Sequence, residues 1–107
     1  MKNITTLKKG DTLAFIATLT DQENKPIIGI ADNLKADVKT INDLKIAEFV
    51  ITENDTIGGN YLFEIMDTTK FPVDILYTDI QYSNNGIVTS SETMTIQVTK
   101  DVTVWAI

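Results

Sequence analysis

The stretch from residue 71 to residue 103 constrains the fold more than any other part of the chain. Two runs rich in Ile, Val, Thr and Tyr flank the cluster Asn84-Asn85-Gly86. Asn and Gly readily adopt the positive φ angles that a tight turn requires. The pattern therefore predicts one long β-hairpin, with shorter strands packed around it.

Two registers of this hairpin are compatible with the sequence. A three-residue loop at Asn84-Asn85-Gly86 would place Leu76 opposite Met94. A two-residue loop at Asn85-Gly86 instead puts six apolar side chains on one face, in opposed pairs: Val73 with Val98, Ile75 with Ile96, and Tyr77 with Met94. We favour the two-residue loop because a wholly apolar face can be buried.

Length and composition predict one globular domain over residues 1–107. The 107-residue chain is long enough for one core, and 43% hydrophobic residues with a mean hydropathy of +0.01 exclude a disordered chain. No apolar run approaches the roughly 18 residues that span a bilayer, and the short run at residues 13–19 lacks the features of a signal peptide. We expect no membrane partner.

Charge and missing residue types exclude several classes of function. The net charge is −6 and the lysines are scattered, whereas nucleic-acid binding needs a basic patch. The chain has no Cys, His or Arg, which removes Cys/His zinc sites, Ser-His and Cys-His pairs, and bidentate Arg clamps. We expect no nucleic-acid partner, no cofactor and no enzyme activity.

The remainder of the chain predicts short strands separated by polar turns. Residues 1–10 are a polar lead-in that ends in a turn at Lys9-Gly10-Asp11. Period-2 alternation then predicts strands at residues 12–20, 34–39, 44–52 and 61–65, with a shorter one at 27–28. In residues 30–44 the alternation of apolar and charged side chains favours a strand over a helix, and residues 67–70 could form a single helical turn.

The strand count predicts an all-β fold. About seven strands, separated by turns at spacings of about ten residues, are typical of an immunoglobulin-like β-sandwich. Leu13, Phe15 and Leu19 should belong to its core. Alternation fails near Ala47-Glu48, where a bulge would restore a common face.

Four groups of polar residues are candidate sites, and each has a simpler structural interpretation. Asp79, inside a predicted strand, suggests half of an acid/base pair or a metal ligand, but surface carboxylates are more common. Residues 21–24 and 54–55 could hold calcium, although their spacing fits turns better. Residues 90–93 carry hydroxyl groups without a base nearby and fit the solvent face of a strand.

Aromatic side chains offer two further candidates. Tyr61, Tyr77 and Tyr82 could form a platform on which a sugar stacks, although tyrosines more often fill a sheet. The apolar tail at residues 102–107 contains Val102, Val104, Trp105 and Ile107, and an apolar terminus is unfavourable in water. We expect these four residues to contact a neighbouring subunit, by lying along or adding to a sheet edge.

Four segments carry a resemblance to a known group of proteins: residues 10–13 (GDTL), 59–63 (GNYLF), 71–82 (FPVDILYTDIQY) and 96–103 (IQVTKDVT). They resemble small tailed-phage virion proteins, in which a Tyr-x-Asp-Ile strand leads into an Asn/Asp-Gly turn and the domain ends in a Val-x-x-Asp-Val-Thr strand. The chain is similar to the immunoglobulin-like or N-terminal domains of phage baseplate upper proteins and related tail or head-attached modules.

The resemblance implies a non-enzymatic structural component of a phage or prophage virion. Such a protein is made in the host bacterial cytoplasm, binds other virion proteins and assembles with copies of itself. Baseplate upper proteins continue beyond such a domain, whereas this chain stops at Ile107, which favours a small stand-alone component. The alternative is a carbohydrate-binding or adhesin-like β-sandwich that uses the tyrosines.

Overall fold

The computed structural model describes residues 2–55 and 57–102, with side chains from Thr5 onward. The described part is almost entirely β-structure, with one short 3-10 helix, η1 (Ala31–Asn33). The strands are β1 (Lys2–Lys8), β2 (Leu13–Thr18), β3 (Leu34–Lys35), β4 (Asp37–Lys39), β5 (Lys45–Glu48), β6 (Val50–Glu53), β7 (Asn60–Ile65), β8 (Ile75–Thr78), β9 (Gln81–Asn84), β10 (Ile87–Ser90) and β11 (Met94–Thr99).

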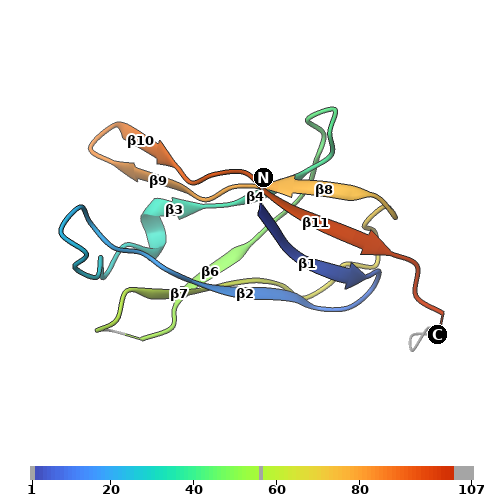
Figure 1. The fold of residues 1–107 in the computed structure, drawn as a ribbon, viewed down its shortest axis with the longest axis horizontal. Helices are drawn as coiled ribbons and strands as arrows, with labels where there is room; N and C mark the ends of the chain where they lie inside the picture. The colour runs from blue at the N-terminus through green and yellow to red at the C-terminus, as the bar shows by residue number, and fades with distance from the viewer. Residues whose placement is uncertain (1, 56, 103–107) are drawn as a thin grey trace.

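The strands form a β-sandwich (Figure 1). One layer has the order β1-β11-β8-β4-β5 and continues into β10-β9-β3, because β3 runs into β4, β8 into β9, and β10 into β11. The other layer is β2-β7-β6, and the chain crosses from β5 to β6 at Phe49. Joining β3 to β4, β5 to β6, β8 to β9 and β10 to β11 gives seven extended passes, which agrees with the expected β-sandwich of about seven strands.

The core lies between the two layers and is supplied by alternate residues of each strand. On β7, Tyr61, Phe63 and Ile65 point inward, while Leu34, Ala36 and Val38 alternate inward along β3 and β4. The period-2 pattern predicted both sets, because a strand with one buried face must alternate. Three aromatic rings meet at the centre: Phe63 stacks on Phe15 with ring centroids 4.8 Å apart, and Phe49 meets Phe15 edge-on at 5.3 Å.

The hairpin keeps the predicted turn but not the predicted face. Asn85 and Gly86 have φ angles of 53° and 83°, and Ile87 lies opposite Asn84, so the loop has two residues. Farther from the turn the register shifts by one, and Ile96 lies opposite Leu76 instead of Ile75. Leu76, Ile96 and Val98 are therefore buried, whereas Val73 and Ile75 are exposed, which contradicts the predicted set of six.

A bulge between β10 and β11 causes this shift. Ser91 N–H donates to Ile80 O, and Met94 lies opposite Thr78, so two residues on one strand face Asp79 alone on the other. The Ser91 hydroxyl accepts a hydrogen bond from Ile80 N–H at 2.9 Å, which satisfies a backbone donor that the bulge leaves unpaired. One extra residue exchanges the two faces of every strand position beyond it.

The predicted lead-in forms an edge strand. β1 pairs in parallel with β11, and Leu7 is buried in the core. The sequence pattern did not predict this strand because it has many polar residues, and an edge strand needs few apolar side chains. The turn at Lys9-Gly10-Asp11 is confirmed, and the buried Thr68 hydroxyl accepts a hydrogen bond from Gly10 N–H and donates one to Asp11 O.

Three smaller expectations need correction. Residues 27–28 form no strand, since the only pairing near them is an isolated bridge between Thr20 and Pro26 within the described residues. Residues 67–70 form a turn without a helix. Phe15 and Leu19 are half-buried against the core, whereas Leu13 is fully buried as expected. The break in alternation near Ala47 is a register irregularity in the pairing of β4 with β5, followed by the crossing at Phe49.

Candidate functional site

A polar hollow of about 510 Å³ lies on the outer face of the larger layer, over β4 and β8. Val38 and Leu76 are buried, so alternation turns Lys39 and Tyr77 outward, where they lie directly opposite one another. Lys35, Asp37, Asp79 and Gln81 also line the hollow. Both signs of charge thus meet in one shallow concave surface.

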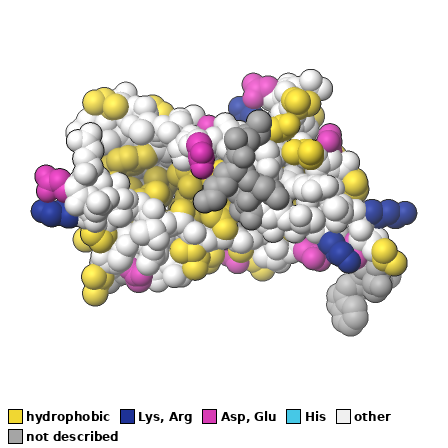
Figure 2. Space-filling view, viewed as in Figure 1, with side chains coloured by type: hydrophobic (Ala, Val, Ile, Leu, Met, Phe, Trp, Pro, Cys, Tyr) yellow, Lys and Arg dark blue, Asp and Glu magenta, His cyan; other side chains and the backbone are white. Residues whose placement is uncertain are grey.

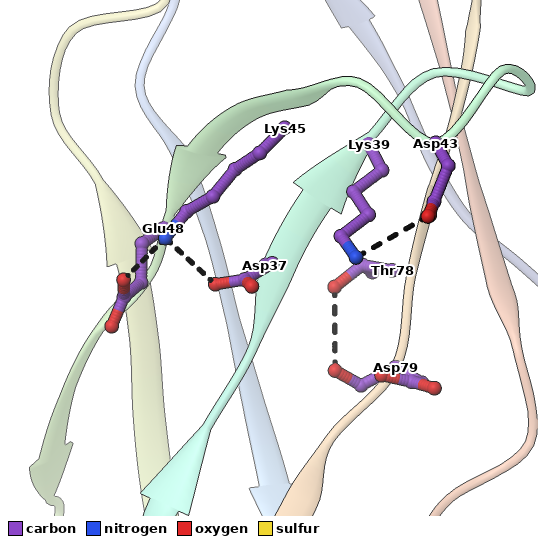
Figure 3. Close-up of polar contacts among 7 residues, drawn as sticks. All are labelled: Asp37, Lys39, Asp43, Lys45, Glu48, Thr78 and Asp79. Atoms are coloured by element: carbon purple, nitrogen blue, oxygen red, sulfur yellow. Dashed lines mark hydrogen bonds and ion pairs between the residues drawn. The ribbon is translucent and has the colours of Figure 1, made fainter.

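Ion pairs organise the charged side chains at one side of this hollow (Figure 3). Lys45 Nζ lies 2.8 Å from Glu48 Oε1 and 3.4 Å from Asp37 Oδ1, and Lys39 Nζ lies 3.3 Å from Asp43 Oδ1. The hydrogen bond to Glu48, followed by the negative charge of Asp37, holds the pKa of Lys45 above its ordinary value. The same hydrogen bond lowers the pKa of Glu48.

Asp79 lies at the break between β8 and β9, half-exposed on the wall of the hollow. Among the described residues, no side chain bonds to its carboxylate, and only its backbone carbonyl accepts a weak hydrogen bond, from Thr78 Oγ1 at 3.5 Å. No group of three His, Cys, Asp or Glu side chains is arranged to hold a metal ion in the part that the structure describes. The hollow offers polar groups for contact with another molecule.

The two acidic loops serve as turns. Asp21 Oδ1 accepts hydrogen bonds from the backbone N–H of Glu23 and of Lys25, at 2.8 and 3.0 Å. Asp55 Oδ1 accepts from the N–H of Ile57 and of Gly58, and its Oδ2 accepts from the Asn60 amide at 2.7 Å. Their oxygens therefore satisfy the backbone of tight turns, as the simpler interpretation predicted.

The Asp55 turn gives a pH-dependent prediction. The hydrogen bond from Asn60, and then those from Gly58 and Ile57, lower the pKa of Asp55 below its ordinary value of 3.8. A carboxyl group with a lowered folded-state pKa stabilises the fold above its unfolded-state pKa, and this stabilisation disappears as the pH falls through the folded-state pKa. Asp55→Asn should therefore lower stability at pH 7, and the difference from the wild type should begin to shrink as the pH falls toward 3.8 and should vanish only below the lowered folded-state pKa.

Urea unfolding at several pH values measures this difference. Asp32→Asn removes the same charge from an exposed position in η1 and is the matched control. A deficit of Asp55→Asn that persisted unchanged into acid would contradict the role of the carboxylate charge.

The three tyrosines do not form a shared platform. Tyr61 is fully buried and its hydroxyl donates to Ile27 O at 2.8 Å, while burial raises its pKa. Tyr82 packs inward against the core, whereas Tyr77 faces outward in the polar hollow. Tyr61 and Tyr82 face the core and Tyr77 alone of the three faces outward, so the three rings offer no exposed pair on which a sugar could stack.

The sequence analysis did not predict two exposed apolar surfaces. On the outer face of β2-β7-β6, Ile16 is 56% exposed beside the half-buried Leu62, and Val50 is 66% exposed in the next row. At the hairpin, Ile87 and Val88 are 70% and 58% exposed. For Ile16, Leu62 and Val50 a signal was present in the sequence, because these side chains fall on the strand face opposite to the predicted core.

The predicted partner-contact tail lies mostly outside the described residues. Val102 is described and is 89% exposed. Val104, Trp105 and Ile107 lie outside the described residues. The predicted role of this tail stays a prediction.

No protein-family model matches the sequence, and no curated protein matches it. Within the described residues, no helix is long and apolar enough to cross a membrane.

Proposed function

We propose that the chain is a structural component of a phage or prophage virion, located in the particle, which acts through contacts with other virion proteins and with copies of itself. The observation that carries the protein-contact role is the exposed apolar surface on an otherwise acidic molecule. Ile16, Val50 and Leu62 share the outer face of β2-β7-β6 with a single acidic side chain in the paired rows, Glu64. Contiguous apolar patches of this kind mark interaction surfaces.

The assignment to a virion rests on the resemblance of the four segments described above. The paired interior of a β-sandwich leaves both outer faces and the strand edges available for contacts. A structural subunit needs only such surfaces, and in the polar hollow Lys39 and Asp37 are held in ion pairs with Asp43 and Lys45.

Particles test the proposal directly. Virions purified from an induced lysogen that carries the gene should contain peptides of this chain, as detected by mass spectrometry. Particles that form normally without any peptide of the chain would overturn the proposal.

The tail gives a second, finer test. Deleting Val104 to Ile107 should leave a folded chain, because the described core contains no residue beyond Val98, but should reduce incorporation into particles. Burying one apolar side chain is worth roughly 1.5 to 3 kcal/mol, so several together can anchor a subunit. An unfolded truncated chain, with blue-shifted Trp105 emission already present in a monomeric wild type, would place the tail in the chain's own core.

The alternative of a carbohydrate-binding module keeps one supporting feature, the outward-facing Tyr77 near the carboxamide of Gln81. A glycan array without a hit would exclude it.

A further inference from the structure

Strand β10 has an open hydrogen-bonding edge. It ends the sheet β10-β9-β3, and its only strand partner among the described residues is β9. Ser91 N–H donates to Ile80 O at 2.8 Å, and antiparallel pairs alternate in the direction of their backbone groups. Ile87 and Thr89 therefore bond to β9, while the N–H and C=O groups of Val88 and Ser90 point away from the sheet.

The surroundings of this edge are uncharged. Residues 80–91 contain no Lys, Asp or Glu, although the chain carries a net charge of −6. All four residues of β10 are exposed, with Ile87 at 70% and Val88 at 58%. Of the other edge strands, β1, β3, β5 and β6 each contain a charged residue, and only β2 shares the uncharged composition of β10 among the described strands. Proteins usually protect an exposed edge with such charges.

A shallow apolar groove of about 210 Å³ runs beneath the hairpin. Ile30, Leu34, Ile80 and Tyr82 line it, together with Thr89 of β10. Figure 2 shows hydrophobic side chains in a recessed part of the surface toward this end of the molecule. A strand added at β10 would direct alternate side chains over this groove, so that backbone hydrogen bonds and apolar contacts would act together.

We propose that β10 pairs antiparallel with β10 of a second copy of this chain, with the two-fold axis at Thr89. Val88 of each copy then lies opposite Ser90 of the other, and these residues exchange their outward N–H···O=C bonds. The strand is self-complementary in this register, as a two-fold interface requires. Both copies carry the same net negative charge, and in this pairing they meet at a segment without charged side chains, which keeps the repulsion between them small.

This pairing rests on the proposed protein-contact function and deepens it by naming a partner and a surface. It is measured in solution without particles, so its failure is distinguishable from a failure of the virion assignment. The β9–β10 hairpin and the C-terminal end of β11 lie at opposite ends of the molecule (Figure 1), so the pairing at β10 does not involve the end of β11.

Sedimentation velocity of the full chain over a range of concentrations tests the pairing. The wild type should form a dimer that dissociates on dilution. Val88→Lys should raise the dissociation constant by about tenfold or more, because a charge enters the uncharged edge. Ile57→Lys adds the same charge at a position that is 82% exposed between β6 and β7, and should leave the dimer unchanged.

Amide hydrogen exchange locates the interface without any substitution. The amides of Val88 and Ser90 should be protected at concentrations where the dimer forms and should lose protection on dilution, while Thr89, bonded to β9, stays protected in both. A wild type that is monomeric throughout overturns the proposal, and so does a Val88→Lys variant that dimerises like the wild type. Protection of Val88 and Ser90 that does not depend on concentration also overturns it.

Discussion

Replacing Phe63 with alanine is expected to lower the free energy of unfolding by about 3 to 5 kcal/mol. Phe63 is fully buried at the centre of the sandwich, stacked on Phe15 and with Phe49 edge-on at 6.2 Å. Its removal loses the transfer free energy of the ring and leaves a cavity between the two layers. Because small domains are stable by only about 5 to 15 kcal/mol, urea unfolding should show a large fall in the midpoint.

The neighbouring residue provides the matched control. Leu62 is next to Phe63 on β7 but points to the outer face, where it is half-buried. Leu62→Ala should cost about 1 kcal/mol or less, since little packed volume is lost. Equal losses for the two variants would mean that β7 does not bury the face that contains Tyr61, Phe63 and Ile65.

Much of the sandwich was predictable because most strands bury one face only. The alternation in residues 34–39 and 61–65 identified which side chains lie in the core, and the Asn85-Gly86 turn followed from the conformational freedom of Asn and Gly. These are local properties, which depend on residues near one another in the sequence. The sandwich architecture was predictable from the number of strands and the spacing of the turns, whereas the strand order was not.

The hairpin face was not predictable because it depends on a bulge that contains no special residue. Glu92 and Thr93 lie opposite Asp79 there, and the position of the bulge is decided by which side chains meet the opposite layer. The number of apolar side chains on each face of the hairpin could not show whether Leu76 or Ile75 is buried, since both faces carry apolar side chains. Strand β1 was missed for a similar reason, because its pairing with β11 is a backbone interaction between distant segments.

The candidate sites divide in the same way, into features set by residues near one another in the sequence and features set by the pairing of distant strands. The role of Asp21 and Asp55 as turn formers was predicted, since each carboxylate bonds to backbone groups a few residues away. The polar hollow joins Lys39 of β4 to Tyr77 of β8, residues that only the sheet order brings together. The free edge of β10 could not be inferred either, because an edge is defined by the strand that is missing beside it.

Replacing Gly59 with alanine should be among the most destabilising changes outside the core. Gly59 has a φ of 69°, and an added Cβ would lie 2.7 Å from Leu19 O and 3.1 Å from Pro26 Cβ. The same backbone accepts a hydrogen bond from Leu19 N–H at 2.9 Å, so neither segment can retreat freely. We expect a loss of about 2 to 5 kcal/mol, of which about 1 to 2 kcal/mol comes from the left-handed backbone and the rest from the close contact.

Gly86 separates these two contributions. It has a similar φ of 83°, but no atom of the described residues lies within 4 Å of the position that its Cβ would occupy. Gly86→Ala should therefore show the backbone cost alone, about 1 to 2 kcal/mol in urea unfolding. The hydrogen bond from Ile27 N–H to Leu19 O at 3.0 Å closes the loop between these two residues. A larger loss for Gly59→Ala is expected only if this closed loop stays packed against the start of β7. Equal losses at the two glycines would show that this loop can move away, and that the β2 end of the sandwich is held by its strands alone.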